Sequence, residues 1–115
     1  MQNDPRETAG QVSQEKIFKE TKNGYFKCEK GSNALYLSFY DRFGWLYGHG
    51  IEIKEGRLIF WGANKRCGIV IYKDTDDKEF IEKVENLMRD MNNDFANCEK
   101  IINFVKSFFK LEGDE

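Results

Sequence analysis

The pattern of apolar residues changes at Asp74, and this change constrains the fold more than any other feature of the chain. Between Lys16 and Lys73, short alternating apolar runs are separated by Gly, Asn and Asp, which is typical of strands joined by tight turns. From Thr75 to Glu112 there is no Gly or Pro, and apolar residues recur at helical spacing. The sequence therefore predicts an α+β fold, with a sheet followed by helices.

The first part is expected to form an antiparallel β-meander of five or six strands. Asn23-Gly24 and Glu55-Gly56 lie between apolar runs and predict tight hairpins, with a type I′ turn at Asn-Gly. The run Arg57–Trp61 is apolar on both sides and is expected to be central in the sheet. The glycines that flank His49 predict a bend or bulge in their strand.

The second part forms either one long helix or two consecutive helices, packed on one face of the sheet. Asp76, followed three residues later by Glu79, resembles the capping box that begins a helix. One helix from Asp76 to Lys110 would be about 52 Å long, whereas a chain of this size has a radius of gyration of about 13 Å. Asn92-Asn93-Asp94 contains poor helix formers that cap well, and this favours two helices broken there.

Length and composition predict a single domain over residues 15–115, preceded by a flexible arm over residues 1–14. The chain has 115 residues, of which 40% are hydrophobic and 33% charged, as in packed domains. The arm is polar, and it has neither the charged start nor the apolar stretch of a signal peptide. No apolar run approaches the roughly 20 residues that span a bilayer. We therefore expect a cytoplasmic protein without a membrane segment.

The cysteines and the only histidine give weak signals. Cys28, Cys67 and Cys98 lie far apart, and their odd number argues against a disulfide framework or a zinc site and suits a reducing compartment. Cys98 falls on the helical stripe and is expected to be a small buried hydrophobe. His49 could act as a general base on an exposed bend, and a dyad with Cys28 or Cys67 would require the pair within hydrogen-bond reach. A structural bend is the favoured interpretation.

The sequence predicts no metal, no cofactor and no enzymatic activity. The acidic cluster that begins at Asp74 places Glu79 at its sixth position, where a calcium loop has Gly. Helix capping explains this cluster better. Catalytic groups are sparse and no motif organises them, so an enzyme is the least favoured class.

Charge is divided unevenly along the chain, whose net charge is −2. There are 11 basic and 6 acidic residues from Glu15 to Lys73, against 6 basic and 12 acidic residues from Asp74 onward. Such a separation steers encounters with charged partners. With the small size and the many aromatic residues, it predicts a protein-binding module. By analogy of size and composition, we expect an inhibitor or immunity protein, an antitoxin that occludes the active site of a toxin such as a nuclease.

The predicted binding residues are acidic side chains of the helical region, which would meet a basic toxin domain. They are Glu79, Glu82, Glu85, Asp90 and Glu99. The apolar end of this region, with Phe104, Phe108 and Phe109, is expected to belong to the core; a homodimer or partner interface is the alternative.

A module that binds single-stranded nucleic acid is the alternative function. Aromatic residues beside basic ones on a sheet can stack bases. The sequence pI of about 5.5 and the lack of a ribonucleoprotein signature argue against it. The residues of this alternative site are Tyr36, Tyr40, Arg57, Lys65, Arg66, Tyr72 and Lys73.

Overall fold

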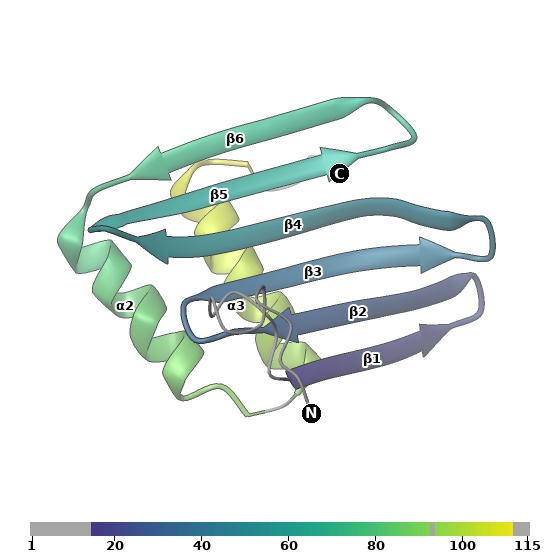
Figure 1. Cartoon of the computed structure of the whole chain (residues 1–115), viewed down its shortest axis with the longest axis horizontal. Helices are drawn as coiled ribbons and strands as arrows, with labels where there is room; N and C mark the ends of the chain where they lie inside the picture. Colours follow the sequence, from purple (N-terminus) through teal and green to yellow (C-terminus); the bar gives the residue numbers. More distant parts are fainter. Residues whose placement is uncertain (1–14, 93, 112–115) are drawn as a thin grey trace, which may run out of the picture.

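The computed structural model describes residues 15–92 and 94–111, which form one sheet and two helices (Figure 1). The predicted arm over residues 1–14 lies outside these described residues. The α+β fold is confirmed, with six antiparallel strands followed by two helices. The strands are β1 (Glu15–Thr21), β2 (Gly24–Lys30), β3 (Ala34–Asp41), β4 (Gly44–Lys54), β5 (Arg57–Asn64) and β6 (Ile69–Thr75), and the helices are α2 (Lys78–Arg89) and α3 (Phe95–Phe108).

Every strand pairs only with its neighbours in sequence, so the sheet order is β1-β2-β3-β4-β5-β6. Both predicted hairpins form. Glu55 and Gly56 have φ values of +53° and +79°, and a type I′ turn needs positive φ at both of these positions. In the β1–β2 hairpin, Thr21 pairs with Gly24, so the turn is centred one residue before Asn23-Gly24. The central residues of the turn are Lys22 and Asn23, and the prediction of a type I′ turn at Asn23-Gly24 is wrong.

A bulge at His49, the second form of the irregularity predicted there, does not occur, because β4 keeps a regular register with β3 and β5 from Gly48 to Glu52. The irregularity lies earlier in β4: Tyr47 pairs with Phe39 and Trp45 with Tyr40, which leaves Leu46 as the extra residue of a bulge. The glycines on either side of His49 serve close packing instead, as described below.

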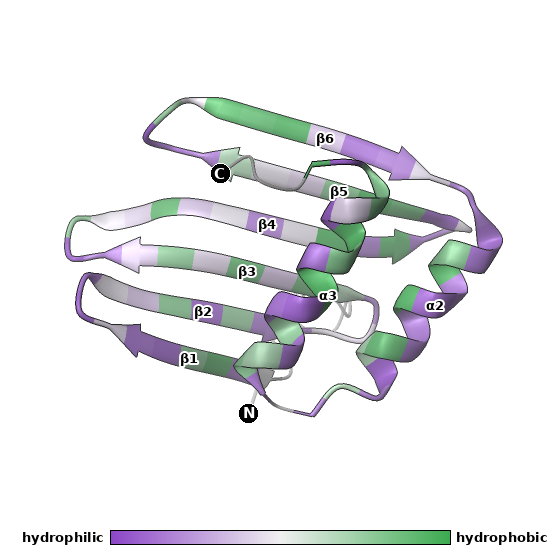
Figure 2. Ribbon diagram, turned by 180° about the vertical axis from the view of Figure 1, so that it is seen from behind, coloured by the Kyte–Doolittle hydropathy of each residue, from purple (hydrophilic) through white to green (hydrophobic). Residues whose placement is uncertain are grey.

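Both helices lie on the same face of the sheet (Figures 1 and 2). α3 crosses the strands from β2, where the rings of Phe95 and Phe26 are 5.2 Å apart, to β5, where those of Phe109 and Phe60 are 6.2 Å apart. The core lies between the helices and the sheet and includes Leu35, Leu37, Ile51, Leu58, Phe60, Ile81, Val84, Met88, Ile101, Ile102 and Val105.

Aspartate side chains begin both helices. Asp77 accepts a hydrogen bond from the backbone N–H of Phe80 (3.1 Å), so the capping residue is Asp77 and not the predicted Asp76. Asp94 accepts one from the backbone N–H of Ala96 (2.9 Å) at the start of α3. The prediction of two helices is thus confirmed. Neither helix in the described ranges is long and apolar enough to cross a membrane.

A disulfide joins Cys28 of β2 to Cys98 of α3, with their Cα atoms 6.7 Å apart and both residues fully buried. The expectation that the chain has no disulfide, and that Cys98 is only a small hydrophobe, is therefore wrong. The two cysteines are 70 positions apart and meet because α3 packs across β2. Spacing along the chain carries no signal for such a contact. The third cysteine, Cys67, is free and exposed.

Candidate functional site: the open face of the sheet

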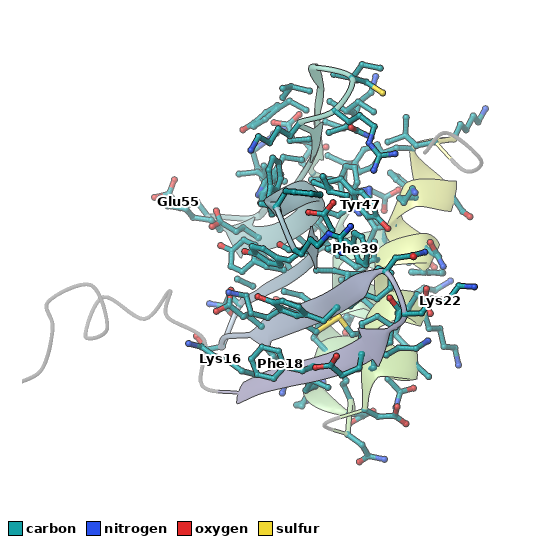
Figure 3. All side chains as sticks on the ribbon, turned by 90° about the vertical axis from the view of Figure 1, so that its right-hand side faces the viewer. Lys16, Phe18, Lys22, Phe39, Tyr47 and Glu55 are labelled. Carbon is teal, nitrogen blue, oxygen red and sulfur yellow. A yellow bond between two sulfur atoms is a disulfide. The ribbon has the colours of Figure 1, made fainter. Side chains whose placement is uncertain are left out.

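The sheet face opposite α2 and α3 carries a group of aromatic side chains, and we call it the open face. In side view the helices lie on one side of the sheet, and side chains project from the other side with no helix of the described chain over them (Figure 3). The alternation along the strands and their register place on this face Phe18, Tyr25, Tyr36, Tyr40, Trp45, Trp61 and Tyr72.

One row of the open face crosses four strands through its central part. Tyr36 lies opposite Gly50, Gly50 opposite Trp61, and Trp61 opposite Tyr72. The indole of Trp61 occupies the space above Gly50, where a Cβ would collide with it, and its ring centroid is 6.1 Å from that of Tyr36. Gly50 is therefore needed so that the two rings can approach each other across β4.

A second aromatic cluster lies toward β1. The rings of Tyr25 and Tyr40 stack 5.2 Å apart with an interplanar angle of 10°, and Phe18 lies 6.0 Å from Tyr25. The Lys27 ammonium is 5.2 Å from the centroid of the Tyr40 ring, in cation–π range. The neighbouring indole of Trp45 packs against its own strand above a second glycine. These contacts bring the rings of this cluster together on the open face.

Carboxylates and lysines of the open face surround Tyr36. The Tyr36 hydroxyl donates a hydrogen bond to the Glu52 carboxylate. The pKa of Tyr36 is raised well above its ordinary value, first by burial, then by this hydrogen bond and by the charges of Glu52 and Glu29. Glu29 itself lies 4.0 Å from the ammonium groups of Lys16 and of Lys27. The centre of the open face is therefore mixed in charge.

The raised pKa of Tyr36 predicts that stability falls as the pH rises above about 10, the ordinary value for tyrosine. The folded protein retains this proton at a pH at which the unfolded chain has lost it. The contribution of Tyr36 is thus complete below about pH 10 and is lost as the pH rises toward the folded-state pKa. Tyr36→Phe should flatten the alkaline decline, measured by urea unfolding from about pH 8 to 11. The same substitution at exposed Tyr72 is the control. Equal declines for the parent and for Tyr36→Phe would contradict this prediction.

The acidic residues predicted to bind a partner all lie on the side of the molecule that carries the helices, and all are exposed. Basic residues are interleaved with them. α2 holds Lys78, Lys83 and Arg89 beside its three glutamates and so carries no net side-chain charge. The predicted set consists of Glu79, Glu82 and Glu85 in α2, Asp90 at its C-terminal cap and Glu99 in α3. The structure therefore gives them a surface of mixed charge.

Arg57, one of the residues predicted for nucleic-acid binding, already has acidic partners. Its Nε lies 3.2 Å from Asp74 Oδ2 and its Nη1 3.7 Å from Asp76 Oδ2. The hydrogen bond to Asp74 is the main cause of the raised pKa of Arg57. Its charge is thus partly neutralised within the chain.

The other basic residues of that alternative site do not join the tyrosines. Lys65 and Arg66 are exposed in the turn between β5 and β6. Lys73 lies on the opposite face of the sheet, because it pairs with Phe60 of the core. Of the predicted set, only Tyr36, Tyr40, Tyr72 and Arg57 share the open face.

His49 lies on the helix side, above Gly62, with its ring 5.9 Å from that of Phe60. His49 and Cys67 line the same hollow of about 80 Å³. A dyad of His49 with Cys28 is excluded, because Cys28 is bound in the disulfide. Within residues 15–92 and 94–111, no group of three His, Cys, Asp or Glu side chains is placed to hold a metal ion.

The predicted sites omitted the two tryptophans of the open face. The run Arg57–Trp61 could have indicated Trp61, because it is apolar on both sides. Leu58 and Phe60 point to the core, and Ile59 and Trp61 point to the open face. The strand lies between β4 and β6 and is an interior strand of the sheet, as expected. Comparison with known protein families, curated proteins and solved structures finds no match to the chain.

Proposed function

We propose that the protein is a binding module that recognises another protein through the open face. The observation that carries this proposal is the set of aromatic side chains gathered on that face with no described helix over them. Tyr and Trp are enriched at the centres of protein interfaces, where they contribute most of the binding energy. Rings held by strands and by one another lose little conformational freedom on binding.

The charges of the open face favour a protein partner over a nucleic acid. A phosphate backbone would meet the carboxylates of Glu29 and Glu52 near the central row, and Arg57 is already paired. Alternating charges around aromatic anchors suit a protein partner whose own charges are also mixed.

The partner class we propose is a toxin, with this chain as its immunity protein. Small size, a rigid face that can cover an active site and the uneven charge of the chain support this proposal. The acidic excess of the chain from Asp74 onward, 12 acidic against 6 basic residues, would then attract a basic partner toward the protein. The proposal does not need a cytoplasmic location, and the buried disulfide favours an oxidising compartment.

Substitution of the aromatic anchors should abolish partner binding. Tyr40→Ala with Trp61→Ala removes one ring from the cluster toward β1 and one from the central row, and loss of an interface hot spot weakens binding by about 30-fold or more. Binding of the full-length chain to its co-purified partner, measured by surface plasmon resonance, tests this expectation. A circular dichroism spectrum and a melting curve establish that the variant is folded.

A matched variant on the other side of the molecule is Glu82→Lys with Glu85→Lys and Asp90→Lys. We expect it to slow association at low salt and to leave the dissociation rate nearly unchanged. If the aromatic variant binds like the parent while the lysine variant does not bind, the helical surface is the binding site and our proposal is wrong. Binding of single-stranded oligonucleotides at low salt, lost in the aromatic variant, would favour the nucleic-acid alternative.

A further inference from the structure

The two edges of the sheet differ in how well they are protected against pairing with another strand. An edge strand has unpaired backbone N–H and C=O groups, and charged side chains normally discourage its pairing. β1 carries the exposed charges of Lys16, Lys19 and Glu20 along its length. β6 begins with Ile69, Val70 and Ile71, which form the hydrophobic part of this strand in Figure 2, and Tyr72 follows them.

The apolar half of β6 is exposed on both sides of the sheet. Ile69 is 55% exposed on the helix side, and Val70 and Tyr72 are 73% and 64% exposed on the open-face side. Ile71 is half-buried. Within the described chain, β6 pairs only with β5. An apolar edge of this kind is a template for a further strand.

We propose that β6 pairs antiparallel with β6 of a second copy and joins two sheets into a twelve-stranded one. With Ile71 on the two-fold axis, it meets its own equivalent, and Val70 lies opposite Tyr72 of the other copy on both sides of the axis. Pairs of aromatic and β-branched side chains stabilise adjacent strands. This register therefore covers Val70 and Tyr72 with each other on the open face and Ile71 with its equivalent on the helix side, and it places Ile69 opposite the side chain of Lys73.

The charges at the two ends of β6 favour the antiparallel arrangement. Lys65 and Arg66 lie exposed in the turn before β6, and Asp74, Asp76 and Asp77 lie exposed at and after its end. Arg57 neutralises part of this acidic group but not all of it. In an antiparallel pair, the basic turn of each copy lies beside the acidic end of the other, whereas a parallel pair would place like charges together.

The pairing takes only Tyr72 from the end of the central row and leaves Tyr36, Trp61 and the aromatic cluster toward β1 uncovered. Dimerisation and partner binding can therefore be tested separately. A two-fold axis perpendicular to the sheet would place the two open faces on the same side of the dimer. The dimer would therefore have both of its binding faces on one side, where they could contact partners together.

Sedimentation velocity of the full chain tests the proposal. The parent should be a dimer that dissociates on dilution, and Val70→Lys should weaken dimerisation by about a hundredfold or more, because lysine would be buried at the pairing edge. Phe18→Lys is the matched control, since Phe18 is 56% exposed on the opposite edge strand, and it should leave the dimer intact. A parent that stays monomeric at millimolar concentration would overturn the proposal, as would loss of the dimer in the control but not in Val70→Lys.

A disulfide across the axis tests the register. Directly opposed residues of antiparallel strands have Cβ atoms about 4.5–5.5 Å apart, close enough for a disulfide to form with small adjustment. In a Cys67→Ser background, Ile71→Cys should give covalent dimers under mild oxidation, and Lys16→Cys on β1 should not. If Ile71→Cys and Lys16→Cys cross-link to the same extent, the covalent dimers arise from random collisions between molecules, and the proposed pairing is wrong.

Discussion

Loss of the Cys28–Cys98 disulfide should lower the free energy of unfolding by about 4 kcal/mol. The bond closes a loop of about 70 residues between β2 and α3, and the chain-entropy treatment gives this value for a loop of that length. For a domain of this size the melting temperature should fall by about 15–30 °C. The measurement is thermal unfolding of the double variant Cys28→Ala, Cys98→Ala beside the parent. Alanine is chosen because both positions are fully buried and a serine hydroxyl would need a hydrogen-bond partner there.

Two controls distinguish the effect of losing the disulfide bond from the effect of replacing a cysteine side chain. Cys67→Ser changes the exposed free thiol and should melt like the parent. A reductant should lower the melting temperature of the parent and leave that of the double alanine variant unchanged. A parent that melts at the same temperature with and without reductant would show that the disulfide does not stabilise the fold.

Phe60→Ala should destabilise the protein by about 3–5 kcal/mol. Phe60 is 1% exposed and is the largest fully buried side chain of the core. Its ring lies 5.9 Å from that of His49 and 6.2 Å from that of Phe109, so it connects the sheet to the end of α3. Removing the ring leaves a cavity between these two layers. Urea unfolding followed by tryptophan fluorescence measures the loss.

Phe43→Ala is the matched control for this variant. Phe43 is 80% exposed in the turn between β3 and β4, and the same truncation there should change stability by no more than about 0.5 kcal/mol. Similar losses for Phe60→Ala and Phe43→Ala would contradict the position of the core between the helices and the sheet.

The architecture was predictable because its signals are local. Alternation of apolar residues and turn sequences such as Glu55-Gly56 indicated the strands, and the uninterrupted stripe after Asp74 indicated helix. The contacts that depend on distant residues were not predictable. Cys28 meets Cys98 only because α3 crosses β2, and a single sequence carries no record of that crossing.

The candidate site was predictable only in part. Tyr36, Tyr40 and Tyr72 share a face because residues two apart along a strand do so, once the register is known. The approach of Trp61 to Tyr36 depends on Gly50, whose lack of a side chain reads in sequence as a bend. A glycine that bends a strand and a glycine that makes room for a neighbouring ring look the same in the sequence. Only the structure shows that the indole of Trp61 lies above Gly50.

The meander topology has a consequence for the order in which the chain acquires its structure. Each strand pairs with the strand that precedes it in the sequence. During synthesis, successive hairpins can therefore form by closing only short loops. The docking of α3 instead joins residues separated by most of the chain, which is the slow kind of contact. We infer that the sheet forms first and that closure by α3 is the late step. The disulfide links β2, which forms early, to α3, which docks last. An unfolded chain that keeps this bond therefore begins refolding with the loop between β2 and α3 already closed.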